Sequence, residues 1–187
     1  MATDRIWTVP NVLSLVRLVL SIVLFVAIEQ RHDVAAFWLF VVAASTDWID
    51  GWYARRFGQV SRLGRILDPF VDKVIVCGAF TLLAAAGTAI APWMAVVVVV
   101  RELAVTAIRA EMEKAGHDFS AVLSGKLKMV LQCAAVALVL AARAWPTLDV
   151  AGVSVGTAAV WIAWAAVVAT IWSGIDYLVA ARPLVRG

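Results

Sequence analysis

Charged residues are scarce in this sequence of 187 residues: Asp, Glu, Lys and Arg make up 16% of it, whereas apolar residues make up 64%. A soluble domain stays close to half apolar because its surface needs polar cover, so this composition excludes an ordinary soluble protein. Segments that alternate polar and apolar residues are also missing, which argues against a β-barrel. Several apolar runs approach the roughly 20 residues that cross a bilayer core. The composition therefore predicts an all-α, polytopic membrane protein with a single domain over residues 1–187.

Cysteine is equally rare. Cys77 and Cys133 each lie within an apolar run, so no disulfide framework is expected. The first nine residues lack a basic start that leads into an apolar core and a small-residue cleavage site, so we expect no cleaved signal peptide. The net charge of +3 is small, and no nucleic-acid partner is expected.

Polar clusters, glycines and prolines divide the chain into six apolar runs, which predict six transmembrane helices. We expect the helices at Val12–Ile28, Val34–Phe57, Asp68–Ala86, Trp93–Lys114, Ser124–Ala142 and Val153–Ala181. Most Lys and Arg residues fall at the helix ends on the side of the two termini, whereas only Arg31 and Arg143 lie at the opposite ends. By the positive-inside rule, both termini are expected to be cytoplasmic in a multi-pass protein of the cytoplasmic membrane.

Four aspartates lie where carboxylates are costly. Asp47 and Asp50 are in the last third of the second predicted helix, and Asp68 and Asp72 begin the third. A charged side chain at the centre of a membrane helix costs about 3 kcal/mol or more. Residues three or four apart share one helix face, and the short turn between the helices returns the chain to the same depth. The sequence therefore predicts that four carboxylates meet near the cytoplasmic surface.

Such a cluster needs positive charge to offset its repulsion. Oxygen ligands suit hard cations such as Mg²⁺, Mn²⁺ or Ca²⁺, and four carboxylates can hold two ions about 4 Å apart, which suits displacement at phosphorus. The alternative is that the aspartates only pair with nearby Arg and Lys side chains. Ion pairs need no particular glycine, however, and Gly51 follows Asp50 directly, where its missing side chain allows a ligand to approach closely.

The acidic residues belong to a longer motif. It reads Asp47-Trp-Ile-Asp50-Gly51-Trp-Tyr-Ala54-Arg55, then eight residues, Gly64, three residues, Asp68, three residues and Asp72. At every defining position this motif resembles the signature of the CDP-alcohol phosphatidyltransferase family. The resemblance extends over most of the chain, because six membrane helices, cytoplasmic termini and an early Pro10-Asn11 with Arg17 are also similar to that family.

The resemblance implies a set of site residues. Those implied to hold two divalent cations, Mg²⁺ or Mn²⁺, are Asp47, Asp50, Asp68 and Asp72. Those implied to line the CDP-lipid pocket are Asn11, Thr46, Gly51, Ala54 and Arg55. Asp72 is also the implied catalytic base, which takes the proton from the acceptor hydroxyl. Members of the family look like homodimers, so a homodimer is expected here.

A second, basic group bears on the acceptor alcohol. Arg101 and Arg109 lie on the fourth predicted helix, and Lys126 and Lys128 on the fifth. Such groups suit a phosphorylated acceptor and argue against choline or ethanolamine, although the two lysines could also be a plain positively charged flank. The spacing Arg-Glu-x-x-x-Thr-x-x-Arg, followed by Gly-Lys-x-Lys, resembles the phosphatidylglycerophosphate-forming branch of the family, except that Met129 stands where a threonine often follows.

The predicted function is transfer of the phosphatidyl group of CDP-diacylglycerol to glycerol 3-phosphate, with release of CMP. Inositol phosphate and phosphatidylglycerol are alternative acceptors. From another class, a divalent-cation transporter would also line its path with carboxylates. Its site would belong near the membrane midplane, often between internal repeats, and no repeat is found. A non-catalytic lipid-binding scaffold would have no use for two metal ions and a base.

Overall fold

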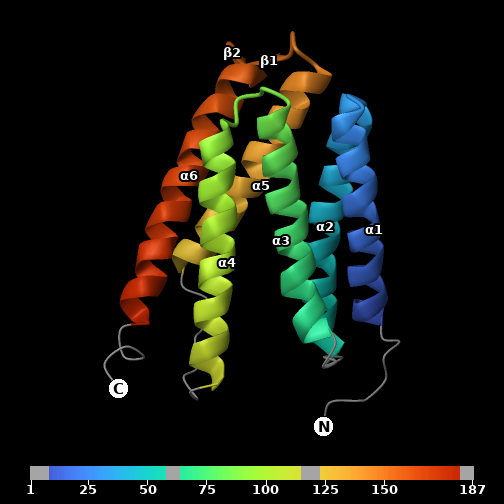
Figure 1. Ribbon diagram of the computed structural model, residues 1–187. Helices are drawn as coiled ribbons and strands as arrows, with labels where there is room; N and C mark the ends of the chain where they lie inside the picture. Colours follow the sequence, from blue (N-terminus) through green and yellow to red (C-terminus); the bar gives the residue numbers. More distant parts are fainter. Residues whose placement is uncertain (1–8, 58–63, 115–122, 182–187) are drawn as a thin grey trace.

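The computed structural model describes residues 9–57, 64–114 and 123–181, with the side chains of residues 12–46, 70–112, 114 and 123–181. The described chain forms α1 (Val9–Glu29), α2 (Asp33–Phe57), α3 (Gly64–Ala85), α4 (Pro92–Lys114), α5 (Leu123–Ala144), β1 (Asp149–Val150), β2 (Val153–Ser154) and α6 (Val155–Ala180). The helices run alternately up and down, so α1 begins and α6 ends at the same end of the bundle (Figure 1). We call this the terminal end, and the opposite end, with β1 and β2, the hairpin end.

The predicted all-α architecture with six helices is confirmed in the described part of the chain. One difference concerns the start of α3. The helix begins at Gly64 and not near Asp68, so Pro69 lies inside it. Proline has no N–H to donate within a helix and is tolerated best in the first turn, whereas Pro69 lies in the second turn of α3. The turn between α2 and α3 was predicted over Gly58–Gly64; its residues 58–63 lie outside the described ones, and Gly64 belongs to α3.

A short hairpin between α5 and α6 was not predicted. Val153 and Ser154 were expected to open the last helix, but they form β2, and Val150 pairs with Val153. The turn between the strands has positive φ at Ala151 (55°) and Gly152 (82°), the combination that two-residue hairpins require. The Ser154 hydroxyl then caps α6 by accepting the backbone N–H of Thr157 at 3.2 Å. The helix therefore begins after Ser154, because this residue satisfies a free donor of its first turn.

The helix ends at the hairpin end contain two turns of the same kind. After α1, the N–H groups of Arg31 and His32 donate to carbonyl oxygens of the last helical turn at 3.3 and 2.9 Å. After α3, those of Gly87 and Thr88 do the same at 3.1 and 3.4 Å. Both turns place one residue in the left-handed region, Arg31 with φ of 58° and Gly87 with φ of 69°. Glycine is the usual residue there, so Arg31 is the unusual one.

The apolar core lies toward the hairpin end. Its large, fully buried side chains come from several helices and include Leu24, Phe40, Phe80, Leu83 and Val136. Helices in lipid associate through close van der Waals packing and not through expulsion of water, so complementary shape matters here. Gly78 gives one example: a Cβ atom at this position would stand 2.2 Å from the ring of Phe25. Glycine therefore lets α1 pack tightly against α3.

The outer surface of the bundle fits a membrane protein. Three stretches in the described part of the chain are long and apolar enough to cross a bilayer: Val12–Glu29 in α1, Leu123–Ala144 and Val155–Ala180. Along α6, exposed side chains such as Trp161 and Trp172 are large and apolar. Contiguous apolar surface of this kind is rare on soluble monomers, and lipid would cover it.

Candidate active site

The four predicted acidic residues lie on the terminal halves of two helices. Asp47 and Asp50 are within α2, and Asp68 and Asp72 within α3, and both helices continue without a break through these positions. The spacings of three and four residues therefore put each pair on one helix face. The predicted residues whose side chains lie outside the described ones are Asn11, Asp47, Asp50, Gly51, Ala54, Arg55 and Asp68.

Asp72 is described, and it forms an ion pair with Arg17 of α1. The Arg17 Nη1 donates to Asp72 Oδ1 at 2.8 Å. The Arg17 side chain is 1% exposed, whereas that of Asp72 is 24% exposed. With Met129 and Cys133 of α5, the pair lines a small cavity of about 30 Å³. A buried guanidinium thus fixes the direction of a carboxylate that stays accessible.

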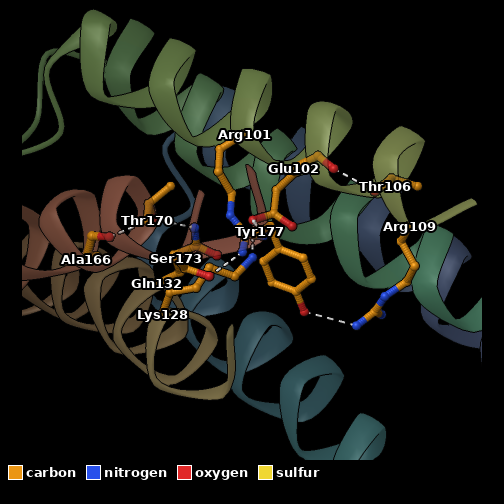
Figure 2. Close-up of polar contacts among 10 residues, drawn as sticks. All are labelled: Arg101, Glu102, Thr106, Arg109, Lys128, Gln132, Ala166, Thr170, Ser173 and Tyr177. Carbon is orange, nitrogen blue, oxygen red and sulfur yellow. Dashed lines mark hydrogen bonds and ion pairs between the residues drawn. The ribbon is translucent and has the colours of Figure 1, made fainter. Parts of the chain in front are cut away.

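A second group of polar residues lies between α4, α5 and α6. We call it the α4–α6 polar cluster; its members are Arg101, Glu102, Arg109, Lys128, Ser173 and Tyr177 (Figure 2). Glu102 is its centre, because its Oε1 pairs with Lys128 Nζ and lies 3.3 Å from Arg101 Nη1. All three of these side chains are less than a tenth exposed. A buried charge in apolar surroundings needs such partners.

Tyr177 holds the two arginines of the cluster. Its hydroxyl accepts from Arg109 Nη2 at 3.0 Å, and Arg101 Nη2 donates to the hydroxyl of Ser173, one turn earlier on α6. The guanidinium carbons of Arg101 and Arg109 lie 5.4 and 5.8 Å from the centre of the Tyr177 ring, within the range of cation–π attraction. In Figure 2 the ring stands between the two arginine side chains. One face of α6 therefore orients both guanidinium groups.

Two glycines lie where the three helices meet at this cluster. A Cβ atom at Gly125 of α5 would stand 3.5 Å from the Tyr177 hydroxyl, and one at Gly174 of α6 would stand 3.4 Å from Arg101 Cγ. Small residues let helix backbones approach closely in membrane proteins. Both distances are ordinary van der Waals contacts, so α5 and α6 lie directly against the side chains of Tyr177 and Arg101 at these glycines.

The cluster is positive overall. It holds three cations, Arg101, Arg109 and Lys128, and one anion, Glu102, so its net charge is +2. Lys73 joins this cluster to the acidic residues: it directly follows Asp72 in α3 and interacts electrostatically with Asp72, Glu102 and Arg109. Lys73 therefore lies near charges of both groups, and α3 packs against α4.

The predicted basic residues do not all lie in the same place. Arg101, Arg109 and Lys128 are in the cluster, whereas Lys126 is exposed on α5. Thr46, predicted near the CDP-lipid pocket, donates its hydroxyl to the Val42 carbonyl at 2.7 Å. Its side chain is thus turned back onto its own helix.

The contributions of α6 were not predicted from the sequence. Ser173 and Tyr177 stand four residues apart in a mainly apolar helix, and Thr170 is a further buried polar residue, which accepts from Gln132 at 2.9 Å. A polar stripe on one face of an apolar helix was the available signal. Arg17 had a signal of the same kind, since it is the only charged residue in its apolar run.

The acidic residues fit divalent cations by their chemistry. Four carboxylates offer only oxygen atoms, the ligands that Mg²⁺ and Mn²⁺ prefer. Among the residues whose side chains are described, no three His, Cys, Asp or Glu residues gather at one point. Three of the four predicted ligands lie outside that part, so the fit depends on ligand type and helix spacing.

Comparison with known proteins identifies the class. A family model described as CDP-alcohol phosphatidyltransferase matches residues 7–172. The chain belongs to this family, and it is therefore a transferase of substituted phosphate groups. This membership does not support the two alternatives from other classes, a transporter and a non-catalytic scaffold.

Similar curated proteins share one name, CDP-diacylglycerol–glycerol-3-phosphate 3-phosphatidyltransferase. The one from Escherichia coli (strain K12) is 34% identical over 185 residues, which are 94% of this chain and 96% of that protein. The one from Bacillus subtilis (strain 168) is 35% identical over 145 residues, 74% of this chain and 69% of that protein. The one from Sodalis glossinidius is 37% identical over 150 residues, 77% and 76% of the two chains.

Proposed function

We propose that this chain transfers the phosphatidyl group of CDP-diacylglycerol to glycerol 3-phosphate, giving phosphatidylglycerophosphate and CMP. Its family and the shared name of its relatives support the reaction and the acceptor. The main structural support for this acceptor is the α4–α6 polar cluster, which has a net charge of +2. Lys73 interacts electrostatically both with this cluster and with Asp72. A phosphorylated acceptor brings the complementary charge, and a cationic acceptor such as choline would be repelled.

The acceptor phosphate is bound by the basic residues of the cluster. Arg101 and Arg109 are held in place by Ser173 and Tyr177, and a guanidinium presents a rigid fork of donors that matches a phosphate. Lys128 adds a third cation, kept in place by Glu102. The fourth residue of this set, Lys126, is exposed and contributes positive charge at the approach to the site.

Asp72 acts as the base. It accepts the proton of the acceptor hydroxyl while that oxygen bonds to the phosphatidyl phosphorus, and the bond from this phosphorus to CMP breaks. A general base must lie within hydrogen-bond reach of the proton that it accepts. The Arg17 guanidinium fixes the orientation of the Asp72 carboxylate. Arg17 is therefore a positioning residue for Asp72.

The remaining predicted residues serve the CDP-lipid. Those that would hold two divalent cations, Mg²⁺ or Mn²⁺, are Asp47, Asp50, Asp68 and Asp72. When bound, the ions would neutralise the diphosphate and stabilise the departing CMP. Those that would line the pocket for the cytidine diphosphate are Asn11, Thr46, Gly51, Ala54 and Arg55.

The site would face the cytoplasm from within the cytoplasmic membrane. In this arrangement all six helices span the bilayer, both termini are cytoplasmic, and the chain acts as one domain in a homodimer. Two observations support the orientation: α1 begins and α6 ends at one end of the bundle (Figure 1), and most Lys and Arg residues fall on that side. Cytoplasmic loops of membrane proteins carry such an excess.

A detergent-micelle assay tests the reaction. Purified protein receives CDP-diacylglycerol and Mg²⁺, each candidate acceptor is supplied separately, and both CMP release and the lipid product are followed. We expect CMP and phosphatidylglycerophosphate with glycerol 3-phosphate alone. Release only with inositol phosphate or with phosphatidylglycerol would overturn the acceptor and keep the reaction class. A folded, metal-supplied protein that releases no CMP with any acceptor would overturn the proposed function itself.

A further inference from the structure

A cavity of about 370 Å³ lies at the hairpin end of the bundle, whereas the α4–α6 polar cluster lies toward the terminal end. It is bounded by the turn after α1, the α3–α4 turn and the facing ends of α5 and α6 (Figure 1). Most of its lining residues are small, among them Ala86, Gly87, Ala142 and Gly156. A volume of this size falls in the range of small-molecule sites.

Two arginines are the charged residues in the lining of this cavity, Arg31 and Arg143. They are also the only Lys or Arg residues in the three sequence segments that form the hairpin end, 26–40, 80–98 and 138–160. Membrane proteins keep Lys and Arg scarce on the side away from the cytoplasm. Both exceptions to this scarcity therefore line one cavity. Asp33 offsets the charge of Arg143, and the remaining positive charge, that of Arg31, favours an anion.

Arg143 has donor capacity left over. Its Nη2 lies 2.6 Å from Asp33 Oδ1 and also donates to the Ile28 carbonyl at 3.4 Å. Its Nη1 is buried and has no hydrogen-bond partner within the described residues. The side chain as a whole is 11% exposed. A buried donor without a partner is destabilising. A shift of the Arg143 guanidinium toward the cavity that its residue lines would bring Nη1 to an anionic oxygen there.

Arg31 occupies a backbone position that favours glycine. The equivalent residue of the matching turn after α3 is Gly87, which lines the same cavity. A left-handed arginine is strained by contact of its Cβ with the backbone, and glycine avoids this contact. Since the turn itself would be better served by glycine, the Arg31 side chain indicates a role beyond the turn.

The position of the cavity points to a lipid. The candidate membrane spans Leu123–Ala144 and Val155–Ala180 end beside it, and Trp93 and Trp145 lie at this end, as expected of an interfacial belt. Val160 lines the cavity, and Trp164, one turn further along α6, is about half exposed and packs against Trp93 with ring centres 5.4 Å apart. An acyl chain can follow this apolar face away from the cavity.

We propose that the cavity binds the phosphate of an anionic phospholipid headgroup. Arg31 and Arg143 contact the phosphate oxygens, and the first turn of α6, at Gly156, adds the positive end of a helix dipole. The acyl chains run along Val160 and Trp164. This site lies at the end of the bundle away from the transferase site and is independent of the acceptor chosen there.

Native mass spectrometry of the full chain from mixed micelles tests this proposal. Phosphatidylglycerol and phosphatidylcholine of matched acyl chains are titrated separately, and bound lipid is counted. Arg31→Gly removes the charge and relieves the left-handed strain, so the variant should fold. Gly156→Leu fills the cavity, because a Cβ there would meet only the Ser154 hydroxyl, at 3.9 Å. Lys114→Ala, which removes an exposed lysine at the terminal end, is the matched control.

We expect the wild-type protein to retain one more phosphatidylglycerol than either Arg31→Gly or Gly156→Leu, with at least a 10-fold weaker apparent Kd for that lipid in both variants. Lys114→Ala should match the wild type, and phosphatidylcholine binding should not change. Unchanged phosphatidylglycerol binding in both variants would overturn the site. If inorganic phosphate alone stabilises the wild-type protein against heat as much as phosphatidylglycerol does, and Arg31→Gly removes that effect, the occupant is free phosphate and the lipid assignment is wrong.

Discussion

The two halves of the bundle are packed in different ways. Toward the hairpin end the buried side chains are apolar, with Phe40, Phe80 and Leu83 among the largest. Toward the terminal end the same helices bury charged residues such as Arg17 and Lys128. The same helices run through both halves, so the two halves differ in the side chains along each helix.

We expect this difference to separate residues that maintain the fold from residues that serve the proposed reaction. Close-packed apolar side chains stabilise an interior, and removal of one leaves a cavity. Buried ion pairs give little net stability compared with apolar residues of the same size. The charges of the terminal half are therefore best explained by function, and each half should respond to substitution in its own way.

The largest effect on activity is expected from Asp72→Asn. The asparagine oxygen can still accept from Arg17, so the fold should be kept, whereas the group that takes the proton is lost. Because general-base catalysis contributes about 10²–10⁴-fold, the kcat of the folded protein should fall by about that factor. The Tm should fall as well, because buried Arg17 loses its charged partner. Asp149→Asn in the hairpin is the matched control, since its oxygen still accepts from Gly152. Near-normal turnover in Asp72→Asn would remove Asp72 from the role of base.

Glu102→Gln should have the largest effect on stability in the terminal half. Arg101 and Lys128 would lose the carboxylate that both of them contact. Removal of one partner of a buried ion pair lowers the free energy of unfolding by about 3–5 kcal/mol. Thermal unfolding in detergent measures this loss. The control is Glu111→Gln, the same change in an exposed pair with Lys114, which should cost below about 1 kcal/mol. Equal losses in the two variants would contradict the special role of the buried charges.

Leu83→Ala tests the opposite half. Leu83 is fully buried in the apolar core, and truncation of such a residue costs about 2–5 kcal/mol. The kcat of the protein that remains folded should equal that of the wild type. A fall in kcat without a matching fall in the folded fraction would show that the two halves are coupled and not separable.

The smallest expected effect is that of Tyr177→Phe. The ring stays between the two arginines, but the hydroxyl that accepts from Arg109 is lost. One such hydrogen bond is worth about 1 kcal/mol, so the KM for glycerol 3-phosphate should rise about 5-fold. The KM for CDP-diacylglycerol serves as the internal control and should not move. A rise in both values, or in neither, would contradict the proposed role of the cluster in acceptor binding.

The sequence predicted the helices well because apolar runs and their interruptions reflect local chemistry. Pro92 begins α4, and Trp145-Pro146 follows the end of α5. The hairpin was missed because it depends on positive φ at Ala151, and alanine is not a residue that indicates positive φ in a sequence. Left-handed Arg31 was missed for the same reason, since glycine or asparagine is the usual signal for that conformation.

The site was predicted in part. The spacing of Asp47, Asp50, Asp68 and Asp72 indicated the acidic residues, because helix periodicity alone puts each pair on one face. The partners of Arg101 and Asp72 could not be predicted in the same way. Ser173 is 72 residues from Arg101 in the sequence, and Arg17 is 55 residues from Asp72. Such contacts depend on how helices pack, which local pattern does not encode.

The pair of Arg17 and Asp72 also sets an order for biosynthesis. Arg17 is made 55 residues before the residue that it contacts in the finished protein. At about 5–20 residues per second, α1 enters the membrane on the order of 3–10 s before α3 is available. During this interval the long arginine side chain would reach toward the lipid headgroups, because a guanidinium is disfavoured deep in hydrocarbon. Docking of α1 against α3 therefore waits until α3 has been made, and it brings Arg17 and Asp72 together at the same time.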